Sequence, residues 1–508
     1  MIRRREFLLG VGMAAYMGGA ALAAPTAGLT VNTRSGKVRG RWAHGIRAFT
    51  GIPFADPPIG ELRFKAPRPA QSWVGELDAT LPAATPPQNV DPSLPPAAPL
   101  SENCLQLNVW APEGPGPYPV FVWIYGGGNA SGAGNQPAYQ GETFARDGVV
   151  CVNLNYRVGV LGFLELGGVT GAGEAGSGNN AIRDQLLALE WVRDNIAAFG
   201  GDPSKVTIGG QSAGAWNCAT LMAIPSAQGL FHQAIIASGL YAAYQPARAT
   251  DFARLFVERL GGKERLHTAS MEDILKAQSA AQTEFADWLP FRPVIDGAFL
   301  PAEPIDLIRA GHAKNVSTMI GHTLDEYRTF LSPAQAEGPI EQKMLVRLDV
   351  KTLPAVVKAY AAAFPNLTPG ERMLRILGAD ALGIPTLRIA EAQAASGAAV
   401  YYYDMRYSIA SGPFGPFSVH GIDVPLIFER VDTAFAHNVF GYGADDLPMA
   451  RRVHAAWVSF VKSGKIDEGL PGWPRYNLQQ RQSLIIDRTP MIAADREKTE
   501  RLIWANFK

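Results

Sequence analysis

Five residues in the middle of the chain have the types and order of a turn that presents a nucleophilic serine. Gly210-Gln211-Ser212-Ala213-Gly214 fits the pattern Gly-x-Ser-x-Gly, and it follows the apolar run at 206–208. In such a strand-to-helix turn the neighbours of the serine must be small, because strand and helix approach each other closely. A surface serine in a glycine-rich turn fits the same five letters, so the pattern needs partners elsewhere in the chain.

A glycine triplet supplies the second requirement of acyl transfer. Gly126, Gly127 and Gly128 follow the apolar run that ends at Tyr125. Backbone N–H groups that no side chain shields can donate hydrogen bonds to an oxyanion beside the serine. Glycine triplets are more often plain turns, but this one lies one strand and one crossover before the serine. Its position therefore favours an oxyanion-hole loop.

The acid and the base of a catalytic triad must follow the serine in the order acid, histidine. Asp325 and Glu326 come just after the apolar run 317–323, and spacing does not choose between them. His420 lies in a Gly/Pro-rich loop after the next apolar run. His437 has no motif around it, and His454 lies in a helical pattern that favours a packed residue. Chain order therefore predicts His420 as the base.

The elements that must position these residues alternate between strand and helix patterns. Residues 29–40 and 47–55 alternate polar and apolar positions around short turns, which predicts antiparallel strands. Later β-rich apolar runs are separated by helical patterns, such as that of residues 181–201 with its final glycine pair. We therefore predict an α/β fold, with a mostly parallel central sheet covered by helices on both faces. The later runs are 120–127, 149–159, 206–214, 233–239, 317–323 and 398–405.

The same alternation predicts one large domain over residues 25–508, since no linker or repeat divides the chain. Helical insertions after the serine strand and around residues 330–400 are expected to form a cap over the site. The Pro-rich stretch 82–99 predicts an irregular surface loop. The cysteines are only three, and they are expected to be buried free thiols: Cys104, Cys151 and Cys218.

The chain has no net charge, with 46 Lys and Arg against 46 Asp and Glu. This balance argues against nucleic acid, anionic membranes or strongly charged molecules as partners. The expected partner is therefore a small, largely uncharged molecule. No segment after the amino terminus is long and apolar enough to span a bilayer. The pattern predicts no oligomeric state.

The first 24 residues predict an export signal. A basic start is followed by an apolar run and by small residues near Ala23. A membrane anchor is the alternative, but Gly12, Gly18 and Gly19 interrupt the short apolar run. The residues from Arg4 to Leu8 resemble a twin-arginine signal, which in bacteria directs the export of folded proteins. A periplasmic or secreted location is expected.

Further motifs, spread over nearly the whole chain after residue 24, resemble the carboxylesterase type B family. They are Gly51-Ile52-Pro53-Phe54-Ala55, Leu62-Arg63-Phe64, Ser101-Glu102-Asn103-Cys104-Leu105, Asn155-Tyr156-Arg157, Asp184-Gln185, Phe199-Gly200-Gly201-Asp202-Pro203 and the turn that ends at Gly214. The resemblance implies an α/β-hydrolase fold and a serine hydrolase of carboxylic esters, with no metal or organic cofactor. A lactone, thioester or amide as substrate, or a non-catalytic binding protein, remains the alternative.

Carried over to this chain, the family pattern assigns each site residue. It implies Ser212 as nucleophile, Glu326 as acid and His420 as base. The implied oxyanion donors are the N–H groups of Gly127, Gly128 and Ala213. Arg63 with Glu102, and Arg157 with Asp184, resemble structural ion pairs of the family.

This chain departs from the family pattern in two places. The segment Thr85-Pro86-Pro87-Gln88 has no cysteine that could pair with Cys104, so Cys104 is expected to be unpaired. The residue before the nucleophile is commonly Glu in the family, and here it is Gln211. The missing charge argues against a preference for cationic choline esters.

Overall fold

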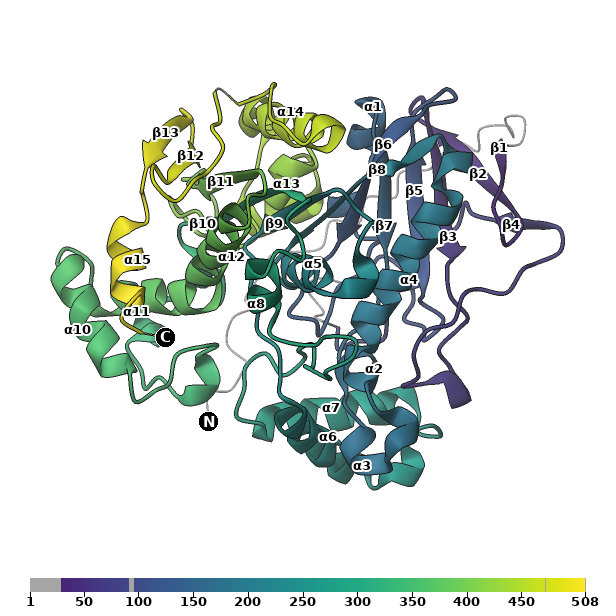
Figure 1. The fold of residues 1–508 in the computed structure, drawn as a ribbon, viewed down its shortest axis with the longest axis horizontal. Helices are drawn as coiled ribbons and strands as arrows, with labels where there is room; N and C mark the ends of the chain where they lie inside the picture. The colour runs from purple at the N-terminus through teal and green to yellow at the C-terminus, as the bar shows by residue number, and fades with distance from the viewer. Residues whose placement is uncertain (1–28, 91–95, 471, 508) are drawn as a thin grey trace.

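A single twisted sheet organises the chain in the computed structural model, which describes residues 29–90, 96–470 and 472–507 (Figure 1). The predicted export signal, residues 1–24, lies outside the described residues. Along the sheet the strand order is β1-β2-β3-β5-β7-β6-β8-β9-β10-β11-β12-β13, with β4 paired to β2. The pairs from β7 through β12 are all parallel, and the remaining neighbours, except β2 with β4, are antiparallel.

The strands follow the expected apolar runs closely. The two amino-terminal hairpins form at the predicted positions, and the runs after residue 118 become the parallel strands. The bounds are β1 (Leu29–Asn32), β2 (Lys37–Ala43), β3 (Ile46–Pro53), β4 (Glu76–Asp78), β5 (Gln106–Ala111), β6 (Tyr118–Ile124), β7 (Val150–Leu154), β8 (Gly201–Gln211), β9 (Gln233–Ala237), β10 (Ser317–Thr323), β11 (Val400–Met405), β12 (Gln482–Ile486) and β13 (Met491–Ala494).

Helices cover both faces of the sheet, as the sequence predicts. On β6, Val122 packs in a core with α4 and α5, whereas its neighbour Trp123 packs in a second core with α1 and α14. Successive side chains of a strand point to opposite faces, so the two cores lie on opposite sides of the sheet. These helices are α1 (Glu142–Arg146), α4 (Asn180–Asn195), α5 (Ala213–Ala223), α8 (Pro304–Arg309), α12 (Ile384–Ala395), α13 (Val424–Ile427) and α14 (Leu447–Ser463).

Two helical insertions interrupt the strand–helix alternation, one between β9 and β10 and the other between β10 and β11. Figure 1 shows α6 and α7 at the lower edge, beneath α4, and α10 and α11 at the lower left, on the side of β10 to β13. The helices of these insertions and the remaining short helices are α2 (Val160–Phe163), α3 (Gly167–Thr170), α6 (Pro246–Leu260), α7 (Met271–Glu284), α9 (Pro333–Ala336), α10 (Leu353–Ala363), α11 (Pro369–Gly378) and α15 (Lys498–Trp504).

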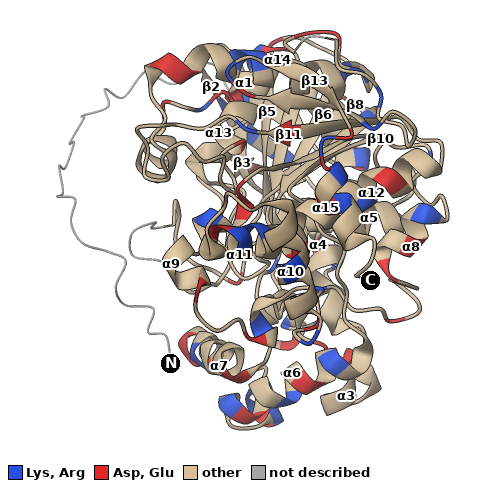
Figure 2. Ribbon diagram, turned by 90° about the vertical axis from the view of Figure 1, so that its left-hand side faces the viewer, with Lys and Arg blue, Asp and Glu red and all other residues tan. Residues whose placement is uncertain are grey.

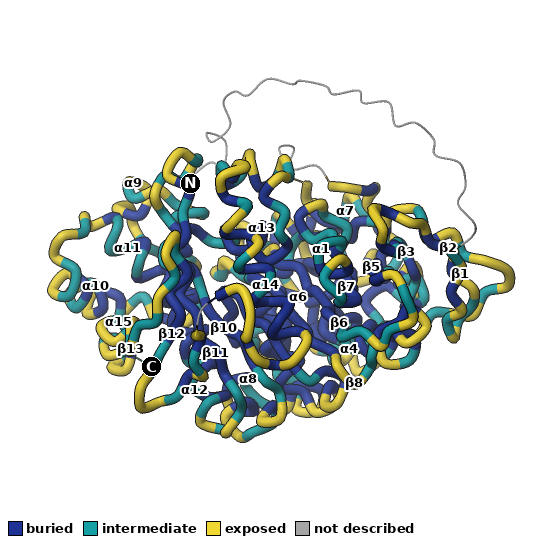
Figure 3. Tube along the Cα trace, turned by 90° about the horizontal axis from the view of Figure 1, so that it is seen from above, coloured by how far each residue is buried: buried dark blue, intermediate teal, exposed yellow. Residues whose placement is uncertain are grey.

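Burial follows this layered arrangement. Buried positions run along the central strands, and exposed positions lie on the outer loops and helices (Figure 3). Lys and Arg are interspersed with Asp and Glu over the helices seen in Figure 2. Cys104, Cys151 and Cys218 are buried and free, as expected. Among the described residues, no helix has both the length and the apolar composition needed to cross a membrane.

Candidate active site

Ser212 is the single residue between β8 and α5, and it has a backbone conformation that residues other than glycine rarely adopt. Its φ is 59° and its ψ is −126°. The turn is closed so tightly that a Cβ on Gly214 would lie 2.0 Å from the carbonyl oxygen of Ile124. A Cβ on Gly210 would lie 2.4 Å from the carbonyl carbon of Gly214. The strand-to-helix context required of a nucleophile turn is therefore present, and the glycines are sterically necessary.

The glycine triplet lies directly beside the serine. A Cβ on Gly126 would come within 3.0 Å of the Ser212 Cβ and within 2.6 Å of the Gln211 carbonyl oxygen. Gly127 and Gly128 have φ values of 120° and 62°, which glycine adopts without strain. Gly127, Gly128 and Ala213, the three predicted oxyanion donors, all line the cavity that contains Ser212.

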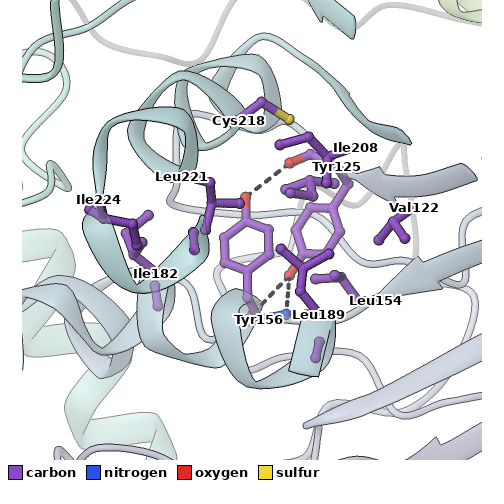
Figure 4. Packing of buried hydrophobic residues seen from close by; sticks show 14 of the residues in the cluster. Val122, Tyr125, Leu154, Tyr156, Ile182, Leu189, Ile208, Cys218, Leu221 and Ile224 are labelled. Carbon is purple, nitrogen blue, oxygen red and sulfur yellow. Dashed lines mark hydrogen bonds between the residues drawn. The ribbon is translucent and has the colours of Figure 1, made fainter. Parts of the chain in front are cut away.

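Two stacked tyrosines fix the end of β6 from which the triplet departs. The rings of Tyr125 and Tyr156 stack with centroids 4.4 Å apart. The Tyr125 hydroxyl donates to the carbonyl oxygen of Tyr156 at 2.8 Å, and the Tyr156 hydroxyl donates to that of Tyr125 at 2.9 Å. Figure 4 shows this pair enclosed by apolar side chains, with Cys218 close by. Because both hydroxyls are satisfied inside the core, the start of the glycine loop is held rigidly.

His420 and Glu326 are joined by a short hydrogen bond. The His420 Nδ1 and the Glu326 Oε2 lie 2.5 Å apart, and the Glu326 side chain is only 3% exposed. Its other oxygen accepts the N–H of Thr323 at 2.9 Å. Asp325 instead accepts the N–H of Ser418 at 3.1 Å. The structure therefore distinguishes the two neighbouring acids, and Glu326 is the one that contacts the histidine.

The carboxylate of Glu326 is held in its ionised form. Burial alone would raise the pKa of Glu326, but the charge and hydrogen bond of His420 outweigh it, and the pKa is lowered. Asp423, also buried, behaves in the opposite way. Burial and the nearby charge of Glu326 raise the pKa of Asp423 to about 6. Two carboxyl groups of this region therefore differ in charge state near pH 5.

Gln211 contacts the other nitrogen of the base. Its Nε2 lies 3.1 Å from the His420 Nε2. Since Nδ1 is bonded to a carboxylate, which only accepts, Nδ1 carries the proton and Nε2 is an acceptor. The Gln211 amide therefore donates to the same lone pair that a serine hydroxyl needs. The place of Gln211 directly before the nucleophile brings its side chain to the histidine.

The cavity that contains Ser212 and His420 has a volume of about 550 Å³. Its wall combines residues of the two helical insertions, such as Trp288 and Phe330, with residues of the Pro-rich segment, such as Thr85 and Gln88, and with the loop after β6. None of the described residues that line it is Asp, Glu, Lys or Arg. A second cavity of about 470 Å³ shares Asn89, Gln282, Trp288 and Phe330 with it. The aromatic side chains on the wall of the first cavity are Tyr139, Trp216, Trp288, Phe291, Phe330 and Phe435.

The sequence gives no signal for this aromatic lining. Trp288 and Phe330 come from the two insertions, which follow no motif, and their rings meet edge to face at 5.2 Å. Phe330 also lies 5.4 Å from the His420 ring. His437 and His454, the alternative histidines, are not among the residues that line the cavity. The structure places them in or before α14 instead.

The two expected structural ion pairs are present. Arg63 and Glu102 lie 2.7 Å apart, and Arg157 and Asp184 also lie 2.7 Å apart with both side chains almost fully buried. Neither pair lines the cavity of Ser212. These charges therefore belong to the scaffold around the site, as the family resemblance implies.

Comparison with known proteins adds a family to this geometry. Residues 27–504 match the carboxylesterase family model. The chain belongs to the carboxylesterase family. It is 35% identical over 483 residues to a para-nitrobenzyl esterase of Bacillus subtilis, covering 93% of this chain and 97% of that protein. A phenmedipham hydrolase of Pseudarthrobacter oxydans is 33% identical over 489 residues, covering 91% and 96% of the two chains.

Solved carboxylesterase structures share the architecture. A PNB esterase structure superposes with a TM-score of 0.82 at 34% identity, covering 93% of this chain and 99% of the other. A carboxylesterase of Geobacillus stearothermophilus gives a TM-score of 0.81 at 32% identity, covering 94% and 99%. The fold is therefore the α/β-hydrolase fold. This carboxylesterase is a carboxylic ester hydrolase, and the cavity around Ser212 is its candidate active site.

Proposed function

We propose that this carboxylesterase hydrolyses esters by two-step acyl transfer with Ser212 as nucleophile. The observation that carries the proposal is the bond between Glu326 and His420 Nδ1, which leaves Nε2 as an acceptor in the cavity of Ser212. Nε2 takes the serine proton while the serine oxygen attacks the ester carbonyl carbon. For this step the hydrogen bond from the Gln211 amide to Nε2 must break, so that the serine hydroxyl can donate to the same lone pair.

The remaining steps use the same groups. The N–H groups of Gly127, Gly128 and Ala213 stabilise the oxyanion, and His420 returns the proton to the leaving alcohol. Water then attacks the acyl-enzyme with His420 again as base, which releases the acid and restores Ser212. Glu326 keeps the imidazole in the required tautomer and stabilises its protonated form.

The substrate class follows from the lining of the cavity. Aromatic and aliphatic walls without a charged residue favour small, largely uncharged esters. One relative is named para-nitrobenzyl esterase and another phenmedipham hydrolase, so we choose a para-nitrobenzyl ester as the first test substrate. A lactone, thioester or amide would require the same nucleophile, so a panel of all four bond types separates them.

The test uses a Ser212→Ala variant on this panel. We expect loss of at least about 10³-fold in kcat on esters, because the nucleophile is removed. Ser279→Ala, which lines only the adjoining cavity, serves as the matched control and should retain activity. Equal ester hydrolysis by Ser212→Ala and the wild type would remove Ser212 from the mechanism. Faster turnover of an amide or a thioester than of every ester would contradict the proposal that esters are the preferred substrates.

We further propose that the protein is exported through the twin-arginine route. The support is the basic start with Arg4 and Arg5, the short apolar run and the small residues before residue 25. Replacing both arginines with lysine should leave uncleaved precursor in the cytoplasm of a bacterial host. Unimpaired export of the double variant would point to the general secretory route.

A further inference from the structure

Three polar side chains from separate segments meet away from the active site. Asp147 follows α1, Glu429 follows α13, and His454 lies in α14. One ligand atom from each lies within 4.8 Å of the others. Figure 1 and Figure 2 show α1 and α14 at the same edge of the molecule, and the rings of Phe144 and His454 pack 4.6 Å apart. None of the three lines the cavity of Ser212.

The buried histidine has one ring nitrogen without a partner. The His454 side chain is 1% exposed, and its Nδ1 lies 2.7 Å from the carbonyl oxygen of Ile427. A carbonyl only accepts, so Nδ1 carries the proton and Nε2 of the neutral ring presents a lone pair. Nε2 makes no hydrogen bond, although the Asp147 Oδ2 lies only 3.2 Å away. In the neutral ring this buried lone pair faces a carboxylate, which is unfavourable unless a proton or a metal ion lies between the two atoms.

We propose that Asp147, Glu429 and His454 form a binding site for a divalent transition-metal ion such as Zn²⁺. One imidazole and two carboxylates are ligands that Zn²⁺ accepts. Zinc–ligand bonds of about 2.0–2.1 Å place neighbouring tetrahedral ligands roughly 3.3 Å apart, close to the separation of Nε2 and Oδ2. A backbone carbonyl on the other ring nitrogen is the usual support of a metal-bound histidine, and Ile427 provides it.

A guanidinium group stands in for the cation in this structure. Arg146 donates to Asp147 at 2.7–2.8 Å and to Glu429 at 2.5 Å, and its side chain is half exposed. Arg451 lies 3.5 Å from Glu429 on the outer side. The Glu429 side chain is only 7% exposed, so its buried charge requires a cation nearby, and a bound metal ion would replace the half-exposed Arg146 in that role. The competing interpretation is a protonated His454 paired with Asp147, with no metal site.

A bound metal ion would link the end of α1, the end of α13 and the helix α14, and α13 directly follows the loop of His420. The family resemblance implies no metal, and no motif points to this site, because the three ligands are far apart along the chain. A bound ion stabilises the folded state in proportion to the logarithm of its concentration. We therefore expect the melting temperature of EDTA-treated protein to rise with Zn²⁺ concentration.

Zinc titration of EDTA-treated, tag-free protein by calorimetry tests the site, with Co²⁺ absorption as a second readout. We expect one saturable ion per chain in the wild type. His454→Gln and Asp147→Asn should each weaken binding at least about 10-fold. His437→Gln, which removes an exposed histidine, is the matched control and should bind as the wild type does.

Arg146→Gln distinguishes a metal site from a simple ion-pair cluster. Removing the competing guanidinium should tighten Zn²⁺ binding, whereas loss of an ordinary stabilising contact would not. No saturable Zn²⁺ binding by the wild type would overturn the proposal. Unchanged affinity in both His454→Gln and Asp147→Asn would also overturn it, as would a weaker affinity in Arg146→Gln. The Asp147 variant keeps the test valid if His454→Gln does not fold.

Discussion

Gln211 connects the nucleophile turn to the base, and its lack of charge has a consequence for substrate choice. Its amide donates to His420 Nε2, so the imidazole keeps the tautomer that a general base requires. A carboxylate at the same place would favour the imidazolium and attract a cationic alcohol group. We therefore expect the wild type to prefer uncharged esters to choline esters of the same acyl chain.

Gln211→Glu should narrow this preference, measured as the ratio of kcat/KM for the two ester types. It should also lower activity on the acid side of the pH profile, because protonated His420 cannot act as a base. Gln282→Glu, which places a charge in the same cavity without a hydrogen bond to His420, is the control. A wild-type preference for the choline ester, or an unchanged ratio in Gln211→Glu, would refute the idea.

Asp423 makes stability depend on pH. Its pKa is about 6 in the folded chain, against 3.8 for an ordinary Asp side chain. Between these pH values the folded chain holds a proton that the unfolded chain has lost, so stability falls as pH rises. Asp423→Asn removes this loss. The free energy of unfolding of Asp423→Asn, relative to the wild type, should therefore be higher at pH 8 than at pH 4. The difference should be on the order of 3 kcal/mol, because each pH unit between the two pKa values contributes about 1.4 kcal/mol.

Urea unfolding midpoints at the two pH values measure this difference. Asp445→Asn changes an exposed carboxylate nearby in the chain and serves as the control. An Asp423→Asn effect of the same size at pH 4 and pH 8 would show that the carboxyl does not titrate in this window.

The end of β6 is the element that sets the oxyanion loop. The Tyr125 hydroxyl holds β6 to the chain just after β7 through the Tyr156 carbonyl. Tyr125→Phe leaves that buried carbonyl without its donor, which should cost about 1–2 kcal/mol of stability. Because the glycine donors follow directly, kcat should fall while KM changes little.

Tyr118 offers a matched control at the other end of β6. Its hydroxyl also donates to a backbone carbonyl, that of Glu113 at 2.8 Å, but near the surface. Tyr118→Phe should leave kcat unchanged. If the two variants reduce kcat equally, the tyrosine pair does not position the oxyanion loop.

At the level of elements, prediction from the sequence succeeds where local patterns decide the structure. The helix pattern at 181–201 becomes α4, followed by a 3₁₀ turn at Ile196–Phe199 and by Gly200 with a φ of 83°. Strand runs such as 206–211 are buried on both faces and carry the expected apolar residues. Their order in the sheet depends on contacts between distant segments, which no local pattern encodes.

At the level of the whole molecule, the sheet and its two helical layers could be predicted from the sequence, whereas the residues that line the cavity of Ser212 could not. Alternating strand and helix patterns are sufficient for a parallel sheet with two helical layers. Ser212 and His420 follow from motif and chain order, but the choice of Glu326 over Asp325 required the family resemblance. Trp288 and Phe330 belong to insertions without a motif, and Asp147 meets His454 only through folding.

Covalent labelling tests the central claim most directly. An aryl phosphonate ester should inactivate the enzyme, because the Ser212 oxygen attacks its phosphorus as it would the ester carbonyl carbon, forming a P–O bond and releasing the aryl alcohol. Mass spectrometry of proteolytic peptides should then find one adduct, on Ser212, in proportion to the activity lost. Ser212→Ala should acquire no adduct under the same conditions. Inactivation with the adduct on another residue, or complete loss of activity with Ser212 unmodified, would contradict Ser212 as the nucleophile.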